Sequence, residues 1–307
     1  MAKKEITGQE NHLNRIKWGT NLCFNILFII LAAICIVPVI FVFMISISSE
    51  ASIAEFGYRF IPDSYSADAY LFMWNERAQI FRALFVSVSV TVAGTVLGLI
   101  LTTTMGYVLS RPGYRLKKFF TWVIFIPMIF NGGMVASYVV VANLLGWRNT
   151  FLVLTVPLAV SSFNIVITRT FFRTTIPDSI IESAEIDGAS QLQTFIRIVM
   201  PISKPVLATI GLFLAFGYWN DWFQASLYIS NENLVGLQAM LNNIMKSIEY
   251  FASHPELGVS LAQYKQSMPS ETVRMAIAIL IVVPIACVYP FFQRYFISGL
   301  TVGAVKG

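Results

Sequence analysis

The sequence predicts an all-α membrane protein with six transmembrane helices. Apolar residues make up 56% of the 307 residues and charged residues only 12%, whereas soluble domains lie nearer one half and one quarter. A core cannot hide that much apolar surface, so lipid is the expected solvent. The apolar windows are long and lack the alternation of barrel strands, and helices are the remaining structure that satisfies the backbone in lipid.

Windows without a charged residue mark the expected spans. They cover residues 19–49, 83–110, 119–147, 149–168, 205–220 and 275–293. A helix needs about 20 apolar residues to cross the hydrocarbon. The window at 205–220 reaches that length if Asp221 lies near the far end of its helix or in a cavity. The predicted spans are about 19–47, 83–110, 119–142, 149–171, 205–229 and 273–293.

The distribution of basic residues predicts the orientation. Fourteen of the 21 Lys and Arg residues lie in the N-terminal segment, the second-to-third and fourth-to-fifth connections and the tail. Cytoplasmic loops are enriched in Lys and Arg, so both termini are expected in the cytoplasm. This topology accounts for the net charge of +5 without a nucleic-acid partner. Residues 1–18 form a cytoplasmic segment expected along the inner membrane surface, and residues 19–307 form one transmembrane domain.

Two long segments lie on the extracytoplasmic side in this predicted topology. Residues 50–80 and 230–270 are either plain connectors or contacts for a partner, because loops of this length tend to be functional or disordered. A helix is expected around Leu237–Ile248. The cysteines, which have no metal-ligand spacing and are expected to be inert packing thiols, are Cys23, Cys35 and Cys287.

A polar insert at residues 177–205 interrupts the apolar pattern on the cytoplasmic side. Ser179 followed by Glu182 has the spacing of a capping box, and Gly188 suits the C-terminal end of a short helix. Ser190 followed by Gln193 repeats the capping pattern, and a second helix is expected to run to about Val199. Pro201 is expected to stop it.

The second helix of this pair is amphipathic. Leu192, Phe195, Ile196 and Val199 are spaced to form one apolar stripe, which is too short to span a membrane. The stripe either lies in the lipid headgroups or docks into a groove of another protein, and docking is the stronger interpretation.

The insert resembles the EAA loop of the membrane subunits of bacterial ABC importers. The residues that carry this resemblance are Glu182-Ser-Ala184, Asp187-Gly188-Ala189, Phe195, Ile198, Pro201 and Lys204-Pro205. Ser183 departs from the pattern, since the family usually has Ala there. The segments Phe130–Val140, Ser161–Phe172, Gly217–Phe223 and Tyr289–Gly307 resemble carbohydrate-importer permeases of the maltose type.

The resemblance implies a type I ABC importer fold in the bacterial cell membrane. It implies that the loop inserts into a cleft of an ATP-binding subunit, through the coupling residues Glu182, Ala184, Asp187, Gly188, Ile198 and Pro201. The implied partners are a second permease, a dimer of ATP-binding subunits, an extracytoplasmic solute-binding protein and a sugar ligand, an oligosaccharide more than a free hexose. No lysine in this chain follows a glycine, so the P-loop motif is absent. The chain is therefore expected to hydrolyse no ATP and to hold no cofactor, with ATP and magnesium on the separate ATPase.

Polar residues inside the predicted spans are candidates for the substrate path. Asp221 is costly in lipid and should face a cavity or a partner subunit. Trp219, Asn220 and Trp222 surround it, and aromatic faces with amide and carboxylate groups suit a carbohydrate. Alternatively, the two tryptophans anchor the helix at the membrane interface and Asn220 joins two helices by a hydrogen bond.

Two further asparagines leave alternatives open. Asn131 precedes two glycines, which indicates either a broken helix beside a pocket or close helix packing. Asn164 either lines a pocket or joins helices. At the level of the whole chain, the alternatives to a sugar importer are an ABC importer for another solute, such as a polyamine or phosphate, and a non-ABC protein, either a secondary carrier or a sensor.

Overall fold

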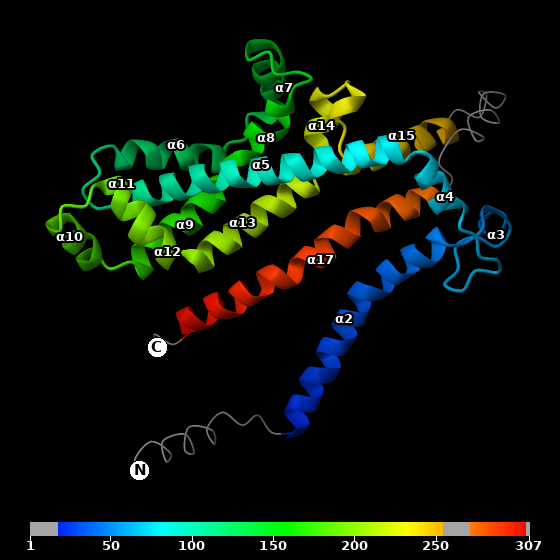
Figure 1. The fold of residues 1–307 in the computed structure, drawn as a ribbon, viewed down its shortest axis with the longest axis horizontal. Coiled ribbons are helices and arrows are strands. Elements are labelled where there is room, and N and C mark those ends of the chain that lie inside the picture. The colour runs from blue at the N-terminus through cyan, green and yellow to red at the C-terminus, as the bar shows by residue number, and fades with distance from the viewer. Residues whose placement is uncertain (1–17, 254–270, 305–307) are drawn as a thin grey trace. The chain divides into compact units, whose positions relative to one another are not determined.

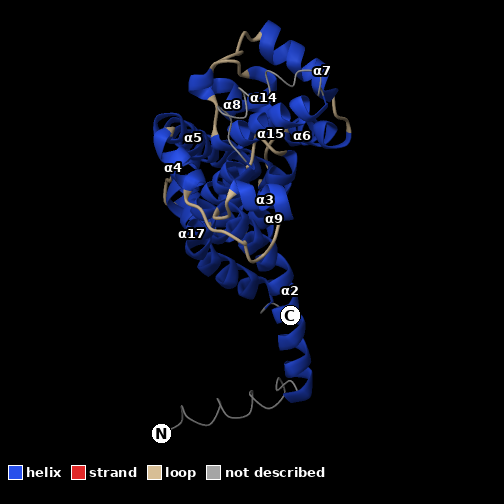
Figure 2. Ribbon diagram, turned by 90° about the vertical axis from the view of Figure 1, so that its right-hand side faces the viewer, coloured by secondary structure: helices blue, strands red, loops and turns tan. Residues whose placement is uncertain are grey.

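The computed structural model describes residues 18–253 and 271–304. These residues form two units, 18–70 with 271–279 and 71–253 with 280–304, and each is described by itself. Within the described ranges every named element is a helix, and the one extended pairing is an isolated bridge between Ser48 and Tyr65 (Figure 2). The predicted all-α class is confirmed for this part of the chain.

The first unit is built around α2, Trp18–Ser46. Its most apolar 18-residue window has a mean hydropathy of 3.3 and no buried residue, so this surface is left for lipid or for another subunit. The rest of the unit comprises α3 (Glu50–Phe56), the first residues of α4 (Asp68–Asn75) and the first residues of α17 (Glu271–Ala304).

Polar contacts order the segment after α2. Ser49 caps α3 by accepting a hydrogen bond from the backbone N–H of Ser52, and the Glu50 carboxylate accepts one from the N–H of Thr272. The hydroxyl of Tyr58 donates to Glu271 at 2.7 Å. Burial, followed by this bond to Glu271, raises the pKa of Tyr58, so the hydroxyl stays protonated and keeps donating.

The second unit is organised around α5, Arg77–Ser110, which at 34 residues is about 50 Å long. It packs beside α8 (Phe151–Ala159), α9 (Ser162–Thr175) and α13 (Lys204–Trp219) (Figure 1). Glycines on α5 permit this approach. A Cβ on Gly94 would lie 2.3 Å from the ring of Tyr218, and one on Gly98 would lie 2.9 Å from the carbonyl oxygen of Ala159. Such small residues let membrane helices pack at backbone distance.

Three of the predicted spans are interrupted. The window at 119–142 becomes α6 (Lys117–Ile129), α7 (Gly133–Tyr138) and a π-helical turn, η1 (Val139–Leu144). The window at 149–171 becomes α8 and α9, which are bent by 48°. The window at 205–229 becomes α13 and α14 (Phe223–Tyr228), separated by residues 220–222.

Two elements that follow α14 lie near the start of α5. A short 3-10 turn, η3 (Glu232–Leu234), precedes α15 (Leu237–Ser253), which confirms the helix predicted around Leu237. The Ser87 hydroxyl accepts a hydrogen bond from the backbone N–H of Leu237, and Arg82 donates to the Asn233 side chain. These contacts fix α15 and the loop before it to the first turns of α5.

The number of spans is only partly decided. Among the described residues, three helices are long and apolar enough to cross a membrane: Trp18–Ser46, Arg77–Ser110 and Glu271–Pro290. Counting each bent pair as one span raises the number to five, so six spans stay a prediction. The segment 1–17 lies outside the described residues. The three cysteines are exposed on this chain by itself, and their role as inert packing thiols stays a prediction.

Candidate functional site

The predicted cytoplasmic pair appears as two short helices at the end of α5, α10 (Asp178–Ile186) and α11 (Gln191–Thr194) (Figure 1). Gly188 ends α10 as predicted, with φ of +80°. The N–H of Ala189 donates to the carbonyl of Ala184 and that of Gly188 to Glu185, which is the Schellman arrangement. Only glycine adopts this φ without strain, so the turn between the helices depends on it.

The second helix of the pair begins with the predicted capping box. The Ser190 hydroxyl accepts from the N–H of Gln193, and the Gln193 side chain accepts from the N–H of Ser190. The Gln191 amide donates to the Glu185 carboxylate at 2.5 Å. This bond joins α10 to α11 across the turn, so the pair holds one bent shape.

Two predicted boundaries are wrong. The helix cap is Pro177 and not Ser179, because the extended proline puts the first helical residue directly after it. Ser179 lies inside the helix, where its carbonyl accepts from Ser183. Pro201 does not end the second helix at Val199: a π-turn, η2 (Phe195–Val199), leads directly into α12 (Met200–Ile202), so the helical stretch continues through the proline and ends one residue after it. The helix ends at Ile202, and the chain bends by 84° at Ser203 before α13 begins.

The residues of the predicted apolar stripe are not all buried. Val199 is fully buried, and Phe195 packs against Tyr107 with ring centroids 4.9 Å apart. Leu192 and Ile196 are 66% and 54% exposed. Ile186, from the end of α10, is 86% exposed. The pair therefore offers apolar side chains outward while its other face is anchored on the chain.

The predicted coupling residues lie on both faces of this pair. Ala184 is buried and Ile198 is half-buried, so these two are covered by the chain itself. Glu182, Asp187, Gly188 and Pro201 are exposed. The first four residues of the set are on α10 and its C-terminal turn, and the last two are on the η2–α12 segment.

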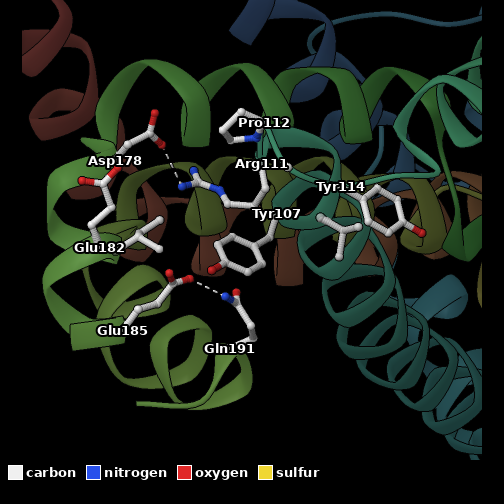
Figure 3. A pocket seen from close by; sticks show the side chains of 11 residues that line it. Tyr107, Arg111, Pro112, Tyr114, Asp178, Glu182, Glu185 and Gln191 are labelled. Carbon is white, nitrogen blue, oxygen red and sulfur yellow. Dashed lines mark hydrogen bonds and ion pairs between the residues drawn. The ribbon is translucent and has the colours of Figure 1, made fainter. Parts of the chain in front are cut away.

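A cavity of about 570 Å³, here the Tyr107 cavity, opens between the pair and the end of α5 (Figure 3). Arg111 lies over the Tyr107 ring at 5.2 Å and its guanidinium is 3.1 Å from the Asp178 carboxylate. Tyr107 is 6% exposed and its hydroxyl has no hydrogen-bond partner among the described residues. Glu182 and Glu185 also line the cavity, so its α10 wall is acidic.

Sequence reasoning missed Tyr107 and Arg111 as parts of this site. The available signal was that Arg111 opens the basic connection four residues after Tyr107, which lies in the last turn of the predicted span. That spacing says nothing of α10, which lies 67 positions further on from Arg111 at Asp178.

The tryptophan–asparagine cluster lies at the break between α13 and α14. Trp219 is 8% exposed and its indole N–H donates to the carbonyl of Ile281 on α17, so it ties two helices together. Trp222 is 41% exposed, with the Lys246 ammonium 5.5 Å from its ring centre. The Asp221 carboxylate accepts from the N–H of Gln224, and the Asn220 side chain accepts from Gln238.

The two remaining asparagines are both at helix breaks. Asn131 is exposed and its side chain accepts from the N–H of Gly133, in the gap between α6 and α7. A Cβ on Gly132 or Gly133 would meet nothing within 4 Å, so the packing alternative has no support from the described residues. Asn164 is 6% exposed and lies on α9, just after its bend with α8.

Comparisons with known proteins agree with this architecture. A family model described as binding-protein-dependent transport system inner membrane component matches residues 94–302. Protein LplC of Bacillus subtilis is 34% identical over 284 residues, 92% of this chain and 94% of LplC. The polygalacturonan/rhamnogalacturonan transport system permease protein YtcP of the same organism is 34% identical over 276 residues, 90% of this chain and 94% of YtcP.

A solved structure is also similar. It is that of a bacterial ABC transporter involved in the import of the acidic polysaccharide alginate, with a TM-score of 0.76, 30% identity, and coverage of 90% of this chain and 96% of that one. The resemblance to importer permeases that the EAA-like loop indicated is thereby confirmed, as is a role in membrane transport and not in catalysis. The chain belongs to the family of binding-protein-dependent transport system inner membrane components.

Proposed function

We propose that this chain is one of two permease subunits of an ATP-driven, binding-protein-dependent importer of oligosaccharides. The family match supports the transport role. The relatives whose names state a substrate support the sugar: YtcP for polygalacturonan and rhamnogalacturonan, and AraQ of Halalkalibacterium halodurans for arabinooligosaccharides. Both are polymers or oligomers of sugars, which favours an oligosaccharide over a free hexose.

The observation that carries the coupling role is the shape of the α10–α11 pair. The Schellman turn at Gly188, the capping box and the Glu185–Gln191 bond make the pair a defined elbow. The elbow leaves Ile186, Leu192 and Ile196 exposed. Burying each such side chain stabilises a complex by about 1.5–3 kcal/mol, which favours docking of these side chains into a groove on an ATP-binding subunit.

The working cycle follows from this arrangement. A separate ATPase dimer would hold ATP and magnesium and supply the closing motion; the docked elbow would follow that motion, and the spans would open the path outward. Hydrolysis resets the path inward. In this proposal Glu182, Asp187 and Gly188 touch the ATPase, whereas Ala184 and Ile198 keep the elbow together and Pro201 helps to shape the turn into α13.

The other partners are a second permease and an extracytoplasmic binding protein. α5 exposes apolar side chains along one face, including Phe81, Phe85 and Val92 at 58–72% exposure, which suits lipid or a second helical subunit. The binding protein would meet the segments near the start of α5, including α15, at the opposite end from the elbow (Figure 1). Six spans with both termini in the cytoplasm complete the proposed topology.

The proposal is tested on Glu182→Lys. The residue is exposed, so the variant should fold and assemble. We expect it to lose uptake of the sugar and the stimulation of ATPase activity by the loaded binding protein. Size-exclusion chromatography of the complex checks assembly, and uptake into proteoliposomes with and without ATP checks function. Uptake that does not depend on ATP would contradict an ATP-coupled importer. Uptake by Glu182→Lys equal to that of the wild type would contradict it too.

A further inference from the structure

A second cavity, here the Asn164 cavity, lies where the α8–α9 helix pair bends and where α13 passes it. Its volume is about 420 Å³. It is lined by Leu158, Ser161, Phe163, Asn164, Phe213, Leu214, Gly217 and Tyr218. Irregular backbone at membrane depth is tolerated where it lines a cavity or is covered by protein, so a bend beside a cavity is a site where polar solutes can be handled.

The amide of Asn164 is unsatisfied within this cavity. The residue is 6% exposed, and its hydrogen bonds within the described ranges use only its backbone: the N–H donates to Ser161 and the carbonyl accepts from Thr168. Because Asn164 lines the cavity and its amide has no protein partner among the described residues, the amide is available to bond a ligand hydroxyl. The Tyr218 hydroxyl, in contrast, already has a hydrogen-bond partner, because it donates to the carbonyl of Thr155.

The rest of the lining has the chemistry of a sugar site. Phe163 and Phe213 are 55% and 44% exposed, so their faces are free to stack on the C–H face of a sugar ring at the cavity mouth. The lining contains no charged residue. A carboxylate would have no cation from this chain to pair with there, and a neutral sugar unit fits better than a uronate.

A neighbouring cavity has a similar lining. It has a volume of about 440 Å³, and its lining includes Ser137, Pro157, Gln224 and Tyr228. The side-chain oxygen of Gln224 is buried and has no partner among the described residues. Tyr228 stacks on Tyr138 with centroids 5.6 Å apart and an angle of 7°. Since Pro157 and Leu158 are consecutive, the two cavities share one segment of wall.

We propose that the Asn164 cavity and the Gln224 cavity are saccharide subsites that hold neutral sugar units, with the two amides bonded to sugar hydroxyls. The inference rests on the proposed function and deepens it: this subunit contacts the sugar directly. The Trp219–Trp222 cluster is then a support of the path, because Trp219 is already bonded to α17.

Two kinds of variant test the Asn164 cavity independently. Asn164→Leu removes the amide at nearly constant volume. Gly217→Leu places a side chain in the cavity, and a Cβ on Gly217 meets nothing within 4 Å. The matched controls are Asn143→Leu, an exposed asparagine on η1, and Gly19→Leu, whose Cβ also meets nothing within 4 Å. Gln224→Leu tests the neighbouring cavity.

The complete importer, with both permeases, the ATPase and the binding protein, is reconstituted in proteoliposomes. Uptake is measured with short arabino-, xylo- and malto-oligosaccharides and with oligogalacturonates. We expect the wild type to import a neutral oligosaccharide. Asn164→Leu and Gln224→Leu should each lower its kcat/KM about tenfold, and Gly217→Leu should lower it more. The controls should stay within about twofold, and ATPase activity stimulated by the unloaded binding protein should be unchanged in all.

The outcomes separate the two levels of the argument. If the wild type imports no saccharide of the panel, the proposed function fails. If it imports neutral saccharides but the cavity variants match their controls, the subsites fail while the proposed function stands. Import of oligogalacturonates alone overturns the neutral subsites. If Asn164→Leu does not assemble, Gly217→Leu decides, because it fills space without removing a contact.

Discussion

The guanidinium of Arg111, one residue past the end of α5, lies 3.1 Å from the carboxylate of Asp178 on α10 and 5.2 Å from the centre of the Tyr107 ring. Tyr107 in turn packs on Phe195 of η2. The end of α5 thus holds both arms of the elbow, one through an ion pair and one through an aromatic contact. Because α5 packs along α8, α9 and α13, we expect a movement of the elbow to reach the spans that line the proposed sugar path.

Arg111→Ala and Asp178→Ala should lower uptake several-fold while ATPase activity persists, since the elbow would move without pulling α5. The Asp178 side chain is 64% exposed, so the ion pair itself should contribute less than about 1 kcal/mol to stability. Uptake per ATP hydrolysed and the thermal midpoint of the complex measure the two effects. The charge-reversed pair Arg111→Asp with Asp178→Arg should recover part of the coupling. A double variant that transports no better than the single variants would contradict a coupling role for the Arg111–Asp178 ion pair.

Gly188→Ala should weaken the elbow by about 1 kcal/mol, because a non-glycine residue at φ of +80° is strained. The expected result is reduced co-purification of the ATPase with little change in the fold of the membrane part. Gly188→Asn is the matched control, since asparagine tolerates the left-handed region better. Equal binding of the ATPase by wild type and both variants would show that the turn is not needed.

Ile186→Ser and Leu192→Ser should each abolish or strongly reduce ATPase binding. At 86% and 66% exposure, neither side chain supports the fold of this chain, so the midpoint of thermal unfolding should shift little. Ser183→Ala serves as the control, because the Ser183 hydroxyl donates only within α10, to Ser179, and the family usually has alanine there. A pull-down with the purified ATPase decides, and retention of binding in both serine variants would contradict the docking surface.

Gly94→Ala should destabilise the second unit by about 1–3 kcal/mol, since the new methyl would lie 2.3 Å from the Tyr218 ring. Thermal unfolding in detergent measures the loss. Gly211→Ala is the matched control, because its Cβ would have an ordinary contact at 3.5 Å with Leu99. Combining Gly94→Ala with Tyr218→Leu should restore part of the stability. If it does not, helix propensity or another contact is responsible.

The local structure of the elbow was predictable where the backbone geometry accepts only a few residue types. Gly188 ends α10 and Ser190 with Gln193 caps α11, because a left-handed turn and an unpaired helix N–H each select their residues locally. Where two residues competed, the prediction was wrong. Ser179 had the right spacing, but Pro177 fixed the helix start two residues earlier.

By itself the sequence determined that this is a helical membrane protein, where its apolar windows lie, and that it carries a loop that resembles the EAA loop of importer permeases, because apolar runs and local turn chemistry are written in consecutive residues. Only the tertiary structure decided that Arg111 meets Asp178, that the bend between α8 and α9 meets a passing α13 at a cavity lined by Asn164, and that the side-chain oxygen of Gln224 is buried without a partner among the described residues. Each of these depends on which helix faces lie together, and that is set by packing between segments far apart in the chain.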